Sequence, residues 1–482
     1  MDADAAHFMN VARCFERGQG FSNPSAWPAW MRPASLPMPE TFKEPAYSWA
    51  IAKLSPLTKS PFRAGQMLSF LAGLLTPLLT WMLVRRLHPE RGVAFLAGLL
   101  AAASPLLIAR SSLVMVESLF AAVFTLLWVV LLSGREGGGA RGAVLDLSAG
   151  VIAGVAFMLR AQTLVAVPAI AILLLRGGLA DALRRSAVIA VAAIVTASPF
   201  LLRNLRLFGS PFHSDVGAFG LMPYMDVITM SGSLERPPAP LGYALHHLPQ
   251  VIAHSVSSAV RFAVRTLPAD VLGNPAWMVP LAIGVLLTLA RWRDWLWVYV
   301  QLAITMAFIF AVNWDDRYFA TSVPLWCALA APGAWWIAER LWTQRLWGPL
   351  GGREVLVAAL ATLLLLQAVA ARRTTREWTA PESLAARSEA AFLREHLKPD
   401  EAVMALTTSY YAYWADRPAV YVIFADPPRF EAEAKRLQVR YAAFPTSRLA
   451  ELAAHFPDGR LPDALVADHA DPAHDVTIFQ VR

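Results

Sequence analysis

The sequence predicts a polytopic α-helical membrane protein that carries a small α/β domain at its C-terminal end. The first observation is composition, because 56% of the 482 residues are hydrophobic and only 16% are charged, a balance rarely found in soluble domains. The second is a series of apolar runs of about 20 residues, the length that crosses a bilayer. The third is a change over roughly the last 110 residues, where short apolar strands alternate with helical stretches.

The net charge of +7 does not by itself indicate a nucleic-acid partner, since the Lys and Arg excess of membrane proteins collects in cytoplasmic loops. We therefore expect no nucleic acid among the partners. The two cysteines, Cys14 and Cys327, are too few for a disulfide framework. The Cys and His spacing does not match a zinc site, so the sequence predicts no metal site.

Eight apolar runs have the length of a single span: 65–84, 93–109, 111–133, 186–202, 276–290, 295–312, 319–338 and 354–371. A ninth run, LSAGVIAGVAFMLRAQTLVAVPAIAILLL (147–175), is too long for one span and is interrupted at Arg160. This pattern predicts two short helices that meet at Arg160. The chain is thus expected to contain about ten membrane segments.

Short arginine-rich loops predict the orientation of these segments, and they cover residues 85–92, 134–142, 176–185, 291–294 and 339–353. If 147–175 forms two segments, all five loops fall on one side, which the positive-inside rule makes cytoplasmic. The N-terminus would then lie outside, although the chain begins without a cleavable signal sequence. We therefore expect the protein to lack its first transmembrane helix, a span that would lie upstream of residue 1.

The predicted organisation has three parts. Residues 1–64 form a first outer loop, 65–371 a membrane module that includes a second outer loop at 203–275, and 372–482 an α/β domain outside the membrane. In the first loop, Phe8, Val11, Ala12 and Phe15 share one helix face, and the Pro- and Trp-rich stretch that follows is typical of the membrane boundary. An interfacial helix and an extended loop on the membrane surface are expected there.

The C-terminal domain shows an alternation of strand and helix patterns. Strands are expected in EAVMAL (401–406), AVYVIF (419–424), VRYAAF (439–444) and DVTIFQVR (475–482), and helices near 381–396, 428–437 and 446–455. The pattern predicts a small α/β unit, and its sequence names no ligand.

Ionisable residues at the membrane edge are costly, so they are candidates for function. The predicted topology collects the following residues on the outer side: Asp2, Asp4, Glu40, Lys43, Glu44, Arg110, Glu117, Arg160, Arg203, Arg206, Asp315, Asp316 and Arg317. Guanidinium groups bind phosphate, and a carboxylate can take a proton from a hydroxyl. Such a pocket suits a phosphate-linked substrate together with a hydroxyl that must be deprotonated.

Five stretches resemble, in the same order, motifs of one known family: DAAHFMNVARCFERGQGF (4–21), FKEPAYSWAIAKL (42–54), ASPLLIARSSLVMVESLFAAVFTLLW (103–128), PFLLRNLRLFGSPF (199–212) and DDRYFATSVPLW (315–326). The family is the GT-C membrane glycosyltransferases, and the nearest branch uses polyprenyl-phosphate sugars. It includes protein O-mannosyltransferases and the lipid A aminoarabinose transferase. The resemblance covers most of the membrane part, and it implies a GT-C-like fold.

The resemblance implies a catalytic base at Asp4, the acidic residue of the first outer loop. The family often has Asp-Glu there, whereas this chain has Asp4-Ala5, which leaves Asp2 as a rival for the role. Asp4 is also a good residue for a helix N-cap, and it can hold either role or both.

Lys43, Arg203 and Arg317 match family positions close to the donor phosphate, although Glu44 replaces a common Pro beside Lys43. The structural alternatives are a solvated loop charge for Lys43 and helix-end anchors for both arginines.

Other candidates for the site are Glu117, Arg110, Arg160, Tyr47 and Tyr318. Glu117 matches the acid that follows the third span, and its alternative is a residue that snorkels at a helix end. The pair Asp315-Asp316 is open to two interpretations, a cation site or a solvated loop in which Asp316 pairs with Arg317.

The implied reaction is an inverting transfer of a sugar from a polyprenyl phosphate to a hydroxyl of a lipid, glycan or protein. We expect no cofactor beyond this lipid-linked donor, because no nucleotide-binding loop is present and these residues do not demand a divalent metal. The expected location is the inner (plasma) membrane, with the site and the C-terminal domain on the periplasmic side. Two alternatives remain, a transporter or flippase of lipid-linked sugars and a catalytically inactive binding relative.

Overall fold

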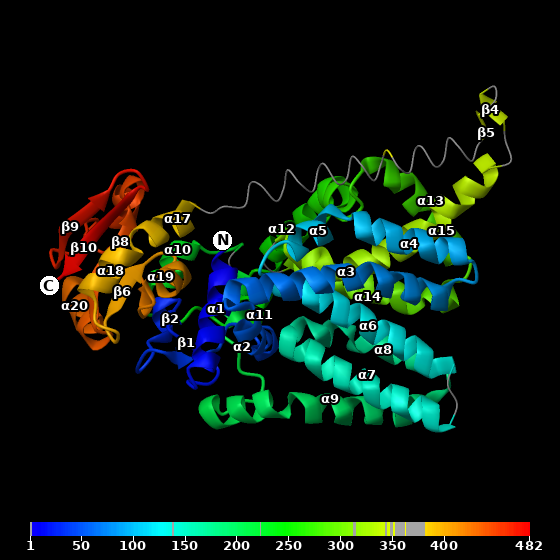
Figure 1. The fold of residues 1–482 in the computed structure, drawn as a ribbon, viewed down its shortest axis with the longest axis horizontal. Helices are drawn as coiled ribbons and strands as arrows, with labels where there is room; N and C mark the ends of the chain where they lie inside the picture. Colours follow the sequence, from blue (N-terminus) through cyan, green and yellow to red (C-terminus); the bar gives the residue numbers. More distant parts are fainter. Residues whose placement is uncertain are drawn as a thin grey trace.

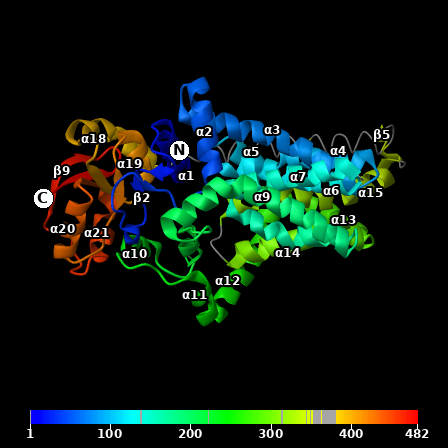
Figure 2. The same cartoon turned by 90° about the horizontal axis from the view of Figure 1, so that it is seen from below.

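The computed structural model describes residues 2–136, 139–221, 223–311, 315–342, 345–347, 350–351, 362 and 381–482. The molecule is elongated, with a bundle of long helices at one end and a helix-covered sheet at the other (Figure 1). The N-terminal segment lies between these two parts, as a second view also shows (Figure 2). We call the end of the bundle that faces the sheet the domain end, and the other end the far end.

Long apolar helices build the bundle. They are α3 (Pro61–Leu87), α6 (Val116–Glu136), α7 (Gly139–Leu159), α9 (Leu179–Phe208) and α14 (Trp292–Ala311). By length and composition these five can cross a membrane, and two bent helix pairs raise the number in the described residues to as many as seven. Large apolar side chains such as Leu74 and Val195 are exposed on this surface, as expected where helices face lipid. The prediction of a polytopic helical membrane protein is confirmed.

The two bent pairs differ from the prediction, which had single spans at 93–109 and 276–290 and placed 248–271 in the second outer loop. Helix α4 (Arg91–Ala103) meets α5 (Pro105–Ser111) at 55°, and the segment Leu248–Val271 meets Pro275–Leu289 at 108°. The latter consists of α12 (Leu248–Arg261), η4 (Phe262–Val271), η5 (Pro275–Trp277) and α13 (Met278–Leu289). Proline at the first helical position accounts for the breaks at Ser104 and Asn274, because it fixes φ and removes an N–H donor.

The predicted number of ten segments exceeds the five to seven that the described helices support by length and composition. The run 319–338 begins as the 3-10 helix η6 (Asp316–Ser322) and continues as α15 (Val323–Trp342). The run 354–371 lies outside the described residues, as does the predicted domain boundary at 372. Between α15 and residue 381, the strands within the described residues are β4 (Arg345–Trp347) and β5 (Leu350–Gly351).

The interruption at Arg160 is present as predicted. Helix α7 ends at Leu159, Arg160 is extended (φ −156°, ψ 126°), and η2 (Ala161–Ala166) and α8 (Val167–Leu175) follow. Residues 161–175 form a short apolar helical segment. The break places a guanidinium at the domain end of the bundle, between two helices that run back toward the far end.

Close approach of α13 and α15 fixes the position of η6, which precedes α15. A Cβ at Gly284 would collide with the carbonyl oxygen of Leu329, and a Cβ at Gly333 would collide with that of Pro280. Small residues at helix contacts are the usual means of bringing membrane helices together. The start of α15, which directly follows η6 and its Arg317, is therefore held against the bundle.

The N-terminal segment differs from the prediction of a helix on the membrane surface. Helix α1 (Ala3–Glu16) packs between α2 (Pro45–Thr58), which precedes the bundle, and α19 (Thr408–Ala415) of the C-terminal unit. Met9, Val11 and Ala12 are fully buried. The sequence pattern found one apolar face, but Ala5 and Met9 provide further apolar surface that a second partner covers.

The loop after α1 also joins the C-terminal sheet. Strands β1 (Ser22–Asn23) and β3 (Met38–Pro39) pair with each other, whereas β2 (Ser25–Ala26) runs parallel to a strand of the large sheet. A short helix, η1 (Ala29–Met31), lies between β2 and β3. The first outer loop and the C-terminal unit therefore share one sheet in this structure.

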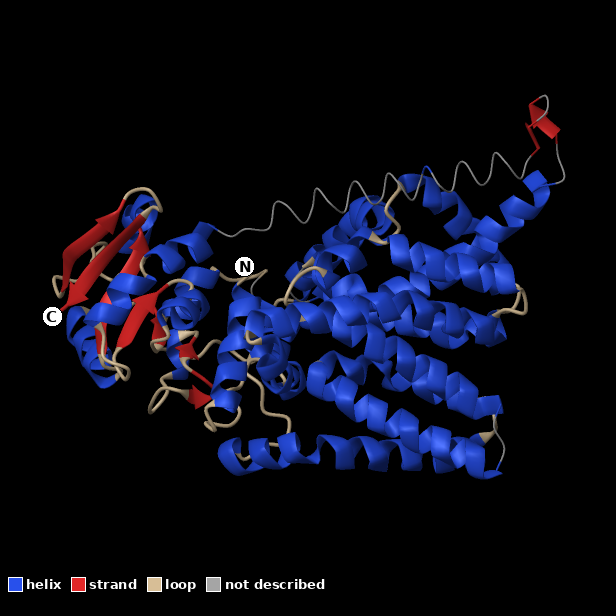
Figure 3. Ribbon diagram, viewed as in Figure 1, coloured by secondary structure: helices blue, strands red, loops and turns tan. Residues whose placement is uncertain are grey.

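The C-terminal unit has a six-stranded sheet in the order β2-β7-β6-β8-β10-β9. Figure 3 shows its strands in red, with helices packed around them. Its other strands are β6 (Ala402–Ala405), β7 (Ala419–Tyr421), β8 (Val439–Pro445), β9 (Leu465–Asp471) and β10 (Val476–Val481). Strands β7 and β8 flank β6 in parallel, and β10 is antiparallel to β8 and β9. All four predicted strands are present, and β2 and β9 are additions that the prediction lacked.

Helices surround this sheet, and further short helices form the connection between α9 and α12. Around the sheet lie α17 (Pro381–Ser388), α18 (Ala390–His396), α19, α20 (Pro427–Arg436), η7 (Thr446–Arg448) and α21 (Leu449–Ala454). The connection contains η3 (Val216–Leu221), α10 (Val227–Gly232) and α11 (Pro240–His246). It contacts the C-terminal unit, because the N–H of Phe424 donates to the carbonyl of Gly232 (2.8 Å).

Candidate active site

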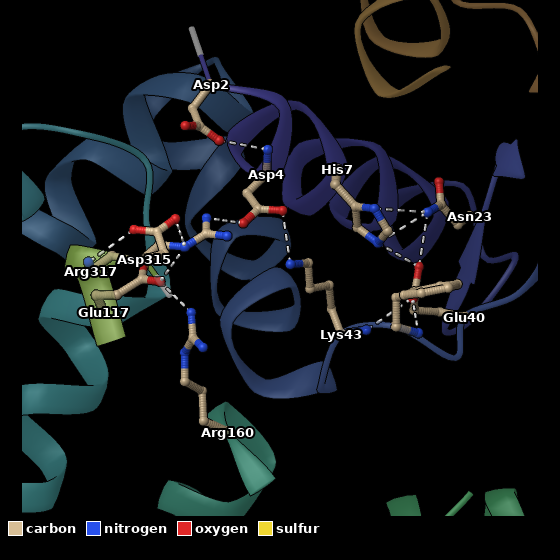
Figure 4. A network of polar contacts seen from close by, with 11 residues as sticks. Asp2, Asp4, His7, Asn23, Glu40, Lys43, Glu117, Arg160, Asp315 and Arg317 are labelled. Atoms are coloured by element: carbon tan, nitrogen blue, oxygen red, sulfur yellow. Dashed lines mark hydrogen bonds and ion pairs between the residues drawn. The ribbon is translucent and has the colours of Figure 1, made fainter. Parts of the chain in front are cut away.

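The start of α1 brings two carboxylates to the domain end of the bundle. Asp2 is the N-cap, and its Oδ1 accepts a hydrogen bond from the N–H of Asp4 (2.8 Å). The capping role considered for Asp4 therefore belongs to Asp2. Asp4 lies in the first turn, and its carboxylate binds two cations, Lys43 through Nζ at 2.8 Å and Arg317 in a close ion pair (Figure 4).

Arg317 connects three carboxylates. Its backbone N–H donates to Oδ1 of Asp315, which caps η6, and its Nε lies 2.9 Å from the other oxygen of Asp315. The same Nε is 3.9 Å from Glu117, and the guanidinium also pairs with Asp4. One guanidinium thus ties together α1, the start of α6 and the start of η6.

Glu117 and Arg160 form the deeper part of the cluster. Glu117 is in the first turn of α6, and its side chain is 3% exposed and ion-paired with Arg160. Its second oxygen, Oε2, has no hydrogen-bond partner among the described residues. The ring of Tyr318 lies 5.2 Å from the Arg160 guanidinium and 5.3 Å from that of Arg317, a distance at which cations are attracted to aromatic faces.

Further polar residues surround this cluster. Arg110 of α5 is buried and lies 3.9 Å from Asp315, and Asp316 accepts a hydrogen bond from the hydroxyl of Thr266 (3.1 Å). Asp316 therefore turns to η4, whereas Asp315 takes the contact with Arg317 that had been considered for Asp316. Within the described residues, no group of three or more His, Cys, Asp and Glu side chains is arranged to hold a metal ion.

Burial and charge shift the acidity of the two α1 carboxyls in opposite directions. Burial alone would raise the pKa of Asp4, but Arg317 and Lys43 together hold it well below its usual range. Burial and the neighbouring charge of Asp4 raise the pKa of Asp2. These directions follow from general electrostatics, since opposite charges favour ionisation and low polarity opposes it.

A second layer of buried polar groups supports Lys43. The Nε2 atom of His7 lies 2.7 Å from Oε2 of Glu40, and Asn23 donates to the same oxygen (2.9 Å). Oε1 of Glu40 accepts hydrogen bonds from the N–H groups of Phe42 (2.6 Å) and Lys43 (3.0 Å). Burial would raise the pKa of Glu40, but His7 and these backbone N–H groups lower it to about 2.

Lys43 also borders a cavity of about 160 Å³ on the side of α9. Much of its wall is apolar and aromatic, with Phe157, Phe200 and Phe212 among its members. Glu44, which replaces the common Pro, lines the same cavity and accepts a hydrogen bond from the N–H of Ala161 (2.9 Å), directly after Arg160. Burial raises the pKa of Glu44. The loop with Lys43 is thus fastened to the break in the bundle.

Two predicted site residues do not join the cluster. The guanidinium of Arg203 donates to the carbonyl of Phe21 (2.9 Å) and to Asn204 (2.8 Å), and it lies over the ring of Phe21. The hydroxyl of Tyr47 contacts Ser69 (2.8 Å) inside the pair α2 and α3. Arg203, near the end of α9, thus contacts the turn after α1, and Tyr47 is buried between α2 and α3.

His7 and Asn23 were not predicted as site residues. His7 is three residues after Asp4 on the same helix, a spacing that places two side chains on neighbouring positions of one face. That spacing was a usable signal for His7. No sequence signal pointed to Asn23, because its hydrogen bond to Glu40 depends on how the loop after α1 folds back.

Comparisons with known proteins agree with this fold. The family model of the dolichyl-phosphate-mannose-protein mannosyltransferases matches residues 39–202, a stretch that includes Lys43, Glu117 and Arg160. The search of curated proteins gave no match.

Solved structures align over nearly the whole chain. ArnT from Cupriavidus metallidurans matches in the apo state with a TM-score of 0.61 and 14% identity, and bound to undecaprenyl phosphate with 0.57 and 13%, each over 99% of this chain and 93% of ArnT. The archaeal oligosaccharyltransferase AglB from Archaeoglobus fulgidus, in complex with an inhibitory peptide and a dolichol-phosphate, matches with 0.60 and 14% over 98% and 70%. The resemblance seen in the motifs is confirmed: the chain has the fold of the GT-C membrane glycosyltransferases.

Proposed function

We propose that the protein is an inverting glycosyltransferase that moves a sugar from a polyprenyl-phosphate donor to a hydroxyl acceptor. The observation that carries this proposal is the position of Asp4 between Lys43 and Arg317. A carboxylate and two cations at one point supply both a proton acceptor and a phosphate-binding group. The undecaprenyl phosphate on ArnT and the dolichol-phosphate on AglB support a lipid-phosphate donor.

The donor phosphate would compete with Asp4 for its two cations. Lys43 and Arg317 are 21% and 16% exposed, so a ligand can reach them. Both cations would then stabilise the charge that develops on the departing phosphate. The apolar cavity beside Lys43 suits the first part of the prenyl chain.

Donor binding would also change the basicity of Asp4. In the free protein its pKa is held low by Arg317 and Lys43, so it is a poor base. When the phosphate takes up these cations, the pKa of Asp4 rises toward its ordinary value and the carboxylate can accept a proton. Asp2, whose pKa is raised in the free protein, is the second candidate for this base.

The chemical step is then a single displacement. The acceptor oxygen forms a bond to the anomeric carbon while its proton passes to the carboxylate. The bond from that carbon to the phosphate oxygen breaks, and the polyprenyl phosphate leaves with the electron pair. Attack opposite the leaving group inverts the anomeric centre.

The orientation that we propose for the protein is supported by its arginines. Arg85, Arg86, Arg176 and Arg291 lie at the far end of the bundle, which the positive-inside rule assigns to the cytoplasm. The cluster and the C-terminal unit would then face the periplasmic side of the inner membrane. The ionisable groups crowd one edge, whereas transporters place their sites near the midplane, and this favours the transferase over the flippase.

The experiment compares Asp4→Asn with Asp2→Asn in the transfer of radiolabelled sugar from polyprenyl phosphate. We expect Asp4→Asn to lower kcat by about 10²- to 10⁴-fold, the range for a lost general base, with donor binding retained. If Asp2→Asn alone has this effect, the base is Asp2. A wild-type protein that binds the donor and transfers nothing would contradict the proposal and favour the inactive or transport alternative.

A further inference from the structure

A second cavity, of about 270 Å³, lies in the C-terminal unit, away from the charge cluster. Leu406 and Thr407, which follow β6, form one side of it, and Ser447 and Arg448, which follow β8, form another. Helix α17 covers it with Glu382. The cavity therefore opens where two neighbouring parallel strands end.

The topology of the sheet singles out this position. From β6 the chain passes through α19 to β7 on one side, and from β7 it passes through α20 to β8 on the other side of β6. The order of strands thus reverses between β6 and β8. In open α/β sheets, ligands bind outside the carboxyl ends of the strands at such a switch point.

The wall of the cavity indicates the kind of ligand. Glu382 and Asp475 contribute carboxylates, Thr407 a hydroxyl, and Tyr411 an aromatic side chain. The two oxygens of Asp475 accept hydrogen bonds from the N–H (2.8 Å) and the hydroxyl of Ser447, and each oxygen keeps a further lone pair for a ligand.

Arg448 is already engaged in a two-pronged contact with Glu451 (2.9 and 2.7 Å). His474, the other basic residue of the wall, lies 2.7 Å from Asp471 through Nδ1. With both basic side chains engaged by carboxylates, the negative charge of Glu382 and Asp475 disfavours phosphates and carboxylates, whereas carboxylate oxygens accept hydrogen bonds from hydroxyl groups.

The volume of the cavity limits the size of the ligand that it can hold. The volume of about 270 Å³ is slightly below the ~300 Å³ at which pockets for drug-sized ligands begin. A single sugar ring suits this space better than an extended chain. At Thr407 the first turn of α19 lacks a side-chain cap, which leaves backbone N–H donors at the cavity wall.

Helix packing places this cavity beside the acidic start of α1. Helices α1 and α19 lie side by side (Figure 1). Asn10 donates to the carbonyl of Ser409 (2.9 Å), and Arg13 donates to that of Tyr413 (2.6 Å). The residue numbers increase in the same direction on both helices from the first contact to the second, so α1 and α19 run parallel. The start of α19, at the cavity, is therefore level with Asn10, roughly 9 Å along α1 from Asp4 at the helical rise per residue.

Tyr410 in the first turn of α19 reports this proximity. Burial raises its pKa, and the charges of Asp2, Glu382 and Asp4 raise it further. Glu382 is a wall residue of the cavity, and Asp2 and Asp4 belong to the charge cluster. Tyr410 thus lies within electrostatic range of both sites.

We propose that the cavity between the ends of β6 and β8 binds an uncharged or amino-bearing sugar ring of a carbohydrate acceptor. This inference rests on the proposed transferase function, and it assigns the acceptor to the glycan class. The ring is held by Asp475, Thr407 and Glu382, and the adjoining hydroxyl-bearing part of the acceptor extends along the start of α19 toward Asp4.

The experiment measures sugar binding to the full chain in detergent by saturation-transfer NMR, which requires no turnover. The probes are N-acetylglucosamine, glucosamine and glucose 6-phosphate, and we expect the first or the second to bind and the phosphate not to bind. Asp475→Asn should weaken binding about tenfold, as loss of a hydrogen bond to a charged group does. Asp475 has a positive φ of 56°, a conformation that Asn also adopts readily, and the amide oxygen of Asn can still accept the N–H of Ser447, so the fold is retained.

Two further variants make the test specific. Thr407→Val removes a wall hydroxyl at nearly constant size and should also weaken binding. Asp400→Asn is the matched control, because Asp400 is exposed near the start of β6, at the opposite edge of the sheet, and it should bind as wild type.

Three results would overturn the proposal: neither uncharged nor amino sugar binds, glucose 6-phosphate binds best, or both wall variants bind like the control. A different result would contradict the transferase proposal: the wild-type protein binds sugar in this cavity but transfers no sugar from the lipid-linked donor.

Discussion

Two groups of buried charges at opposite ends of the helix bundle are built in different ways. Near the far end, Arg185 of α9 makes three hydrogen bonds of 2.9 to 3.2 Å to Asp146 of α7. Their side chains are 6% and 2% exposed. At the domain end, Arg317 is shared by Asp4, Asp315 and Glu117, and Asp4 in turn is shared by Arg317 and Lys43.

The two groups differ in the number of ion-pair partners of each side chain and in the exposure of the side chains to solvent. The pair at the far end consists of one acid and one base from two neighbouring helices. In the part of the chain that the structure describes, neither side chain has an alternative ion-pair partner to which it could turn if a ligand bound. The cluster at the domain end joins residues from five separate segments, its cations are 16% to 21% exposed, and each group has more than one partner. A buried exclusive pair fixes two helices, whereas a shared and accessible cluster can give up a contact to a ligand.

The largest expected effect is on stability, from Asp146→Ala. Removal of one partner leaves the Arg185 guanidinium buried without compensation, which costs about 3–5 kcal/mol. Thermal unfolding in detergent should show a strongly lowered midpoint, while the donor KM of the folded fraction stays unchanged. The matched control is Asp181→Ala, whose exposed pair with Arg184 contributes little. A changed donor KM in Asp146→Ala would show that the two groups of charges are coupled.

The second expected effect is on donor binding, from Lys43→Met. Loss of a charge-assisted contact to phosphate costs about 1.5–3 kcal/mol, which raises the donor KM about 10- to 100-fold. Stability should change little, because Lys43 is partly exposed and Asp4 keeps Arg317. Lys53→Met on the outer surface of α2, where the ammonium lies over Trp49, is the control. An unchanged KM would remove Lys43 from the donor site.

Much of the bundle could be predicted from the sequence, because hydrophobic length is a direct consequence of bilayer thickness. The interruption at Arg160 is the clearest case, since the apolar run 147–175 is longer than one span needs and a charge divides it. The same reasoning collected Asp4, Lys43, Glu117, Arg160 and Arg317 at one end, and the structure brings all five into one cluster.

The contacts that depend on tertiary folding could not be predicted. The pairing of β2 with β7 joins residues almost 400 positions apart, and a two-residue strand has no pattern of its own. Helix α1 was placed on the membrane because one apolar face was visible, whereas α19 covers a second face. Arg203 matched a family position, but the local turn at Phe21 takes its hydrogen bonds.

A smaller effect is expected from Glu40→Gln, which tests the layer behind Lys43. Gln keeps the shape but weakens the contacts with His7 and with the N–H groups of Phe42 and Lys43. We expect a cost of about 1 kcal/mol, or about a fivefold rise in donor KM. Glu16→Gln at the exposed end of α1 is the control. If stability falls while KM holds, Glu40 supports the fold and does not position Lys43.

The pH dependence of this layer has a defined sign. The pKa of Glu40 is about 2 in the folded protein against an ordinary value of 4.5, so the folded state favours the ionised form. Its contribution to stability is fully present above about pH 4.5 and is lost as the pH falls toward 2. Wild type should therefore lose more stability over this range than Glu40→Gln, and equal losses in pH-dependent unfolding would contradict the assignment.

The smallest expected effect comes from Arg17→Ala, at the exposed end of the α1–α19 contact. Arg17 pairs with Asp416 at 2.8 Å, but their side chains are 51% and 44% exposed. Surface pairs of this kind contribute less than about 1 kcal/mol, so transfer and thermal unfolding should remain close to wild type. A large loss of transfer without loss of stability would mean that α19 controls the position of Asp4 through the whole length of α1. The charge cluster and the C-terminal unit would then act as one site.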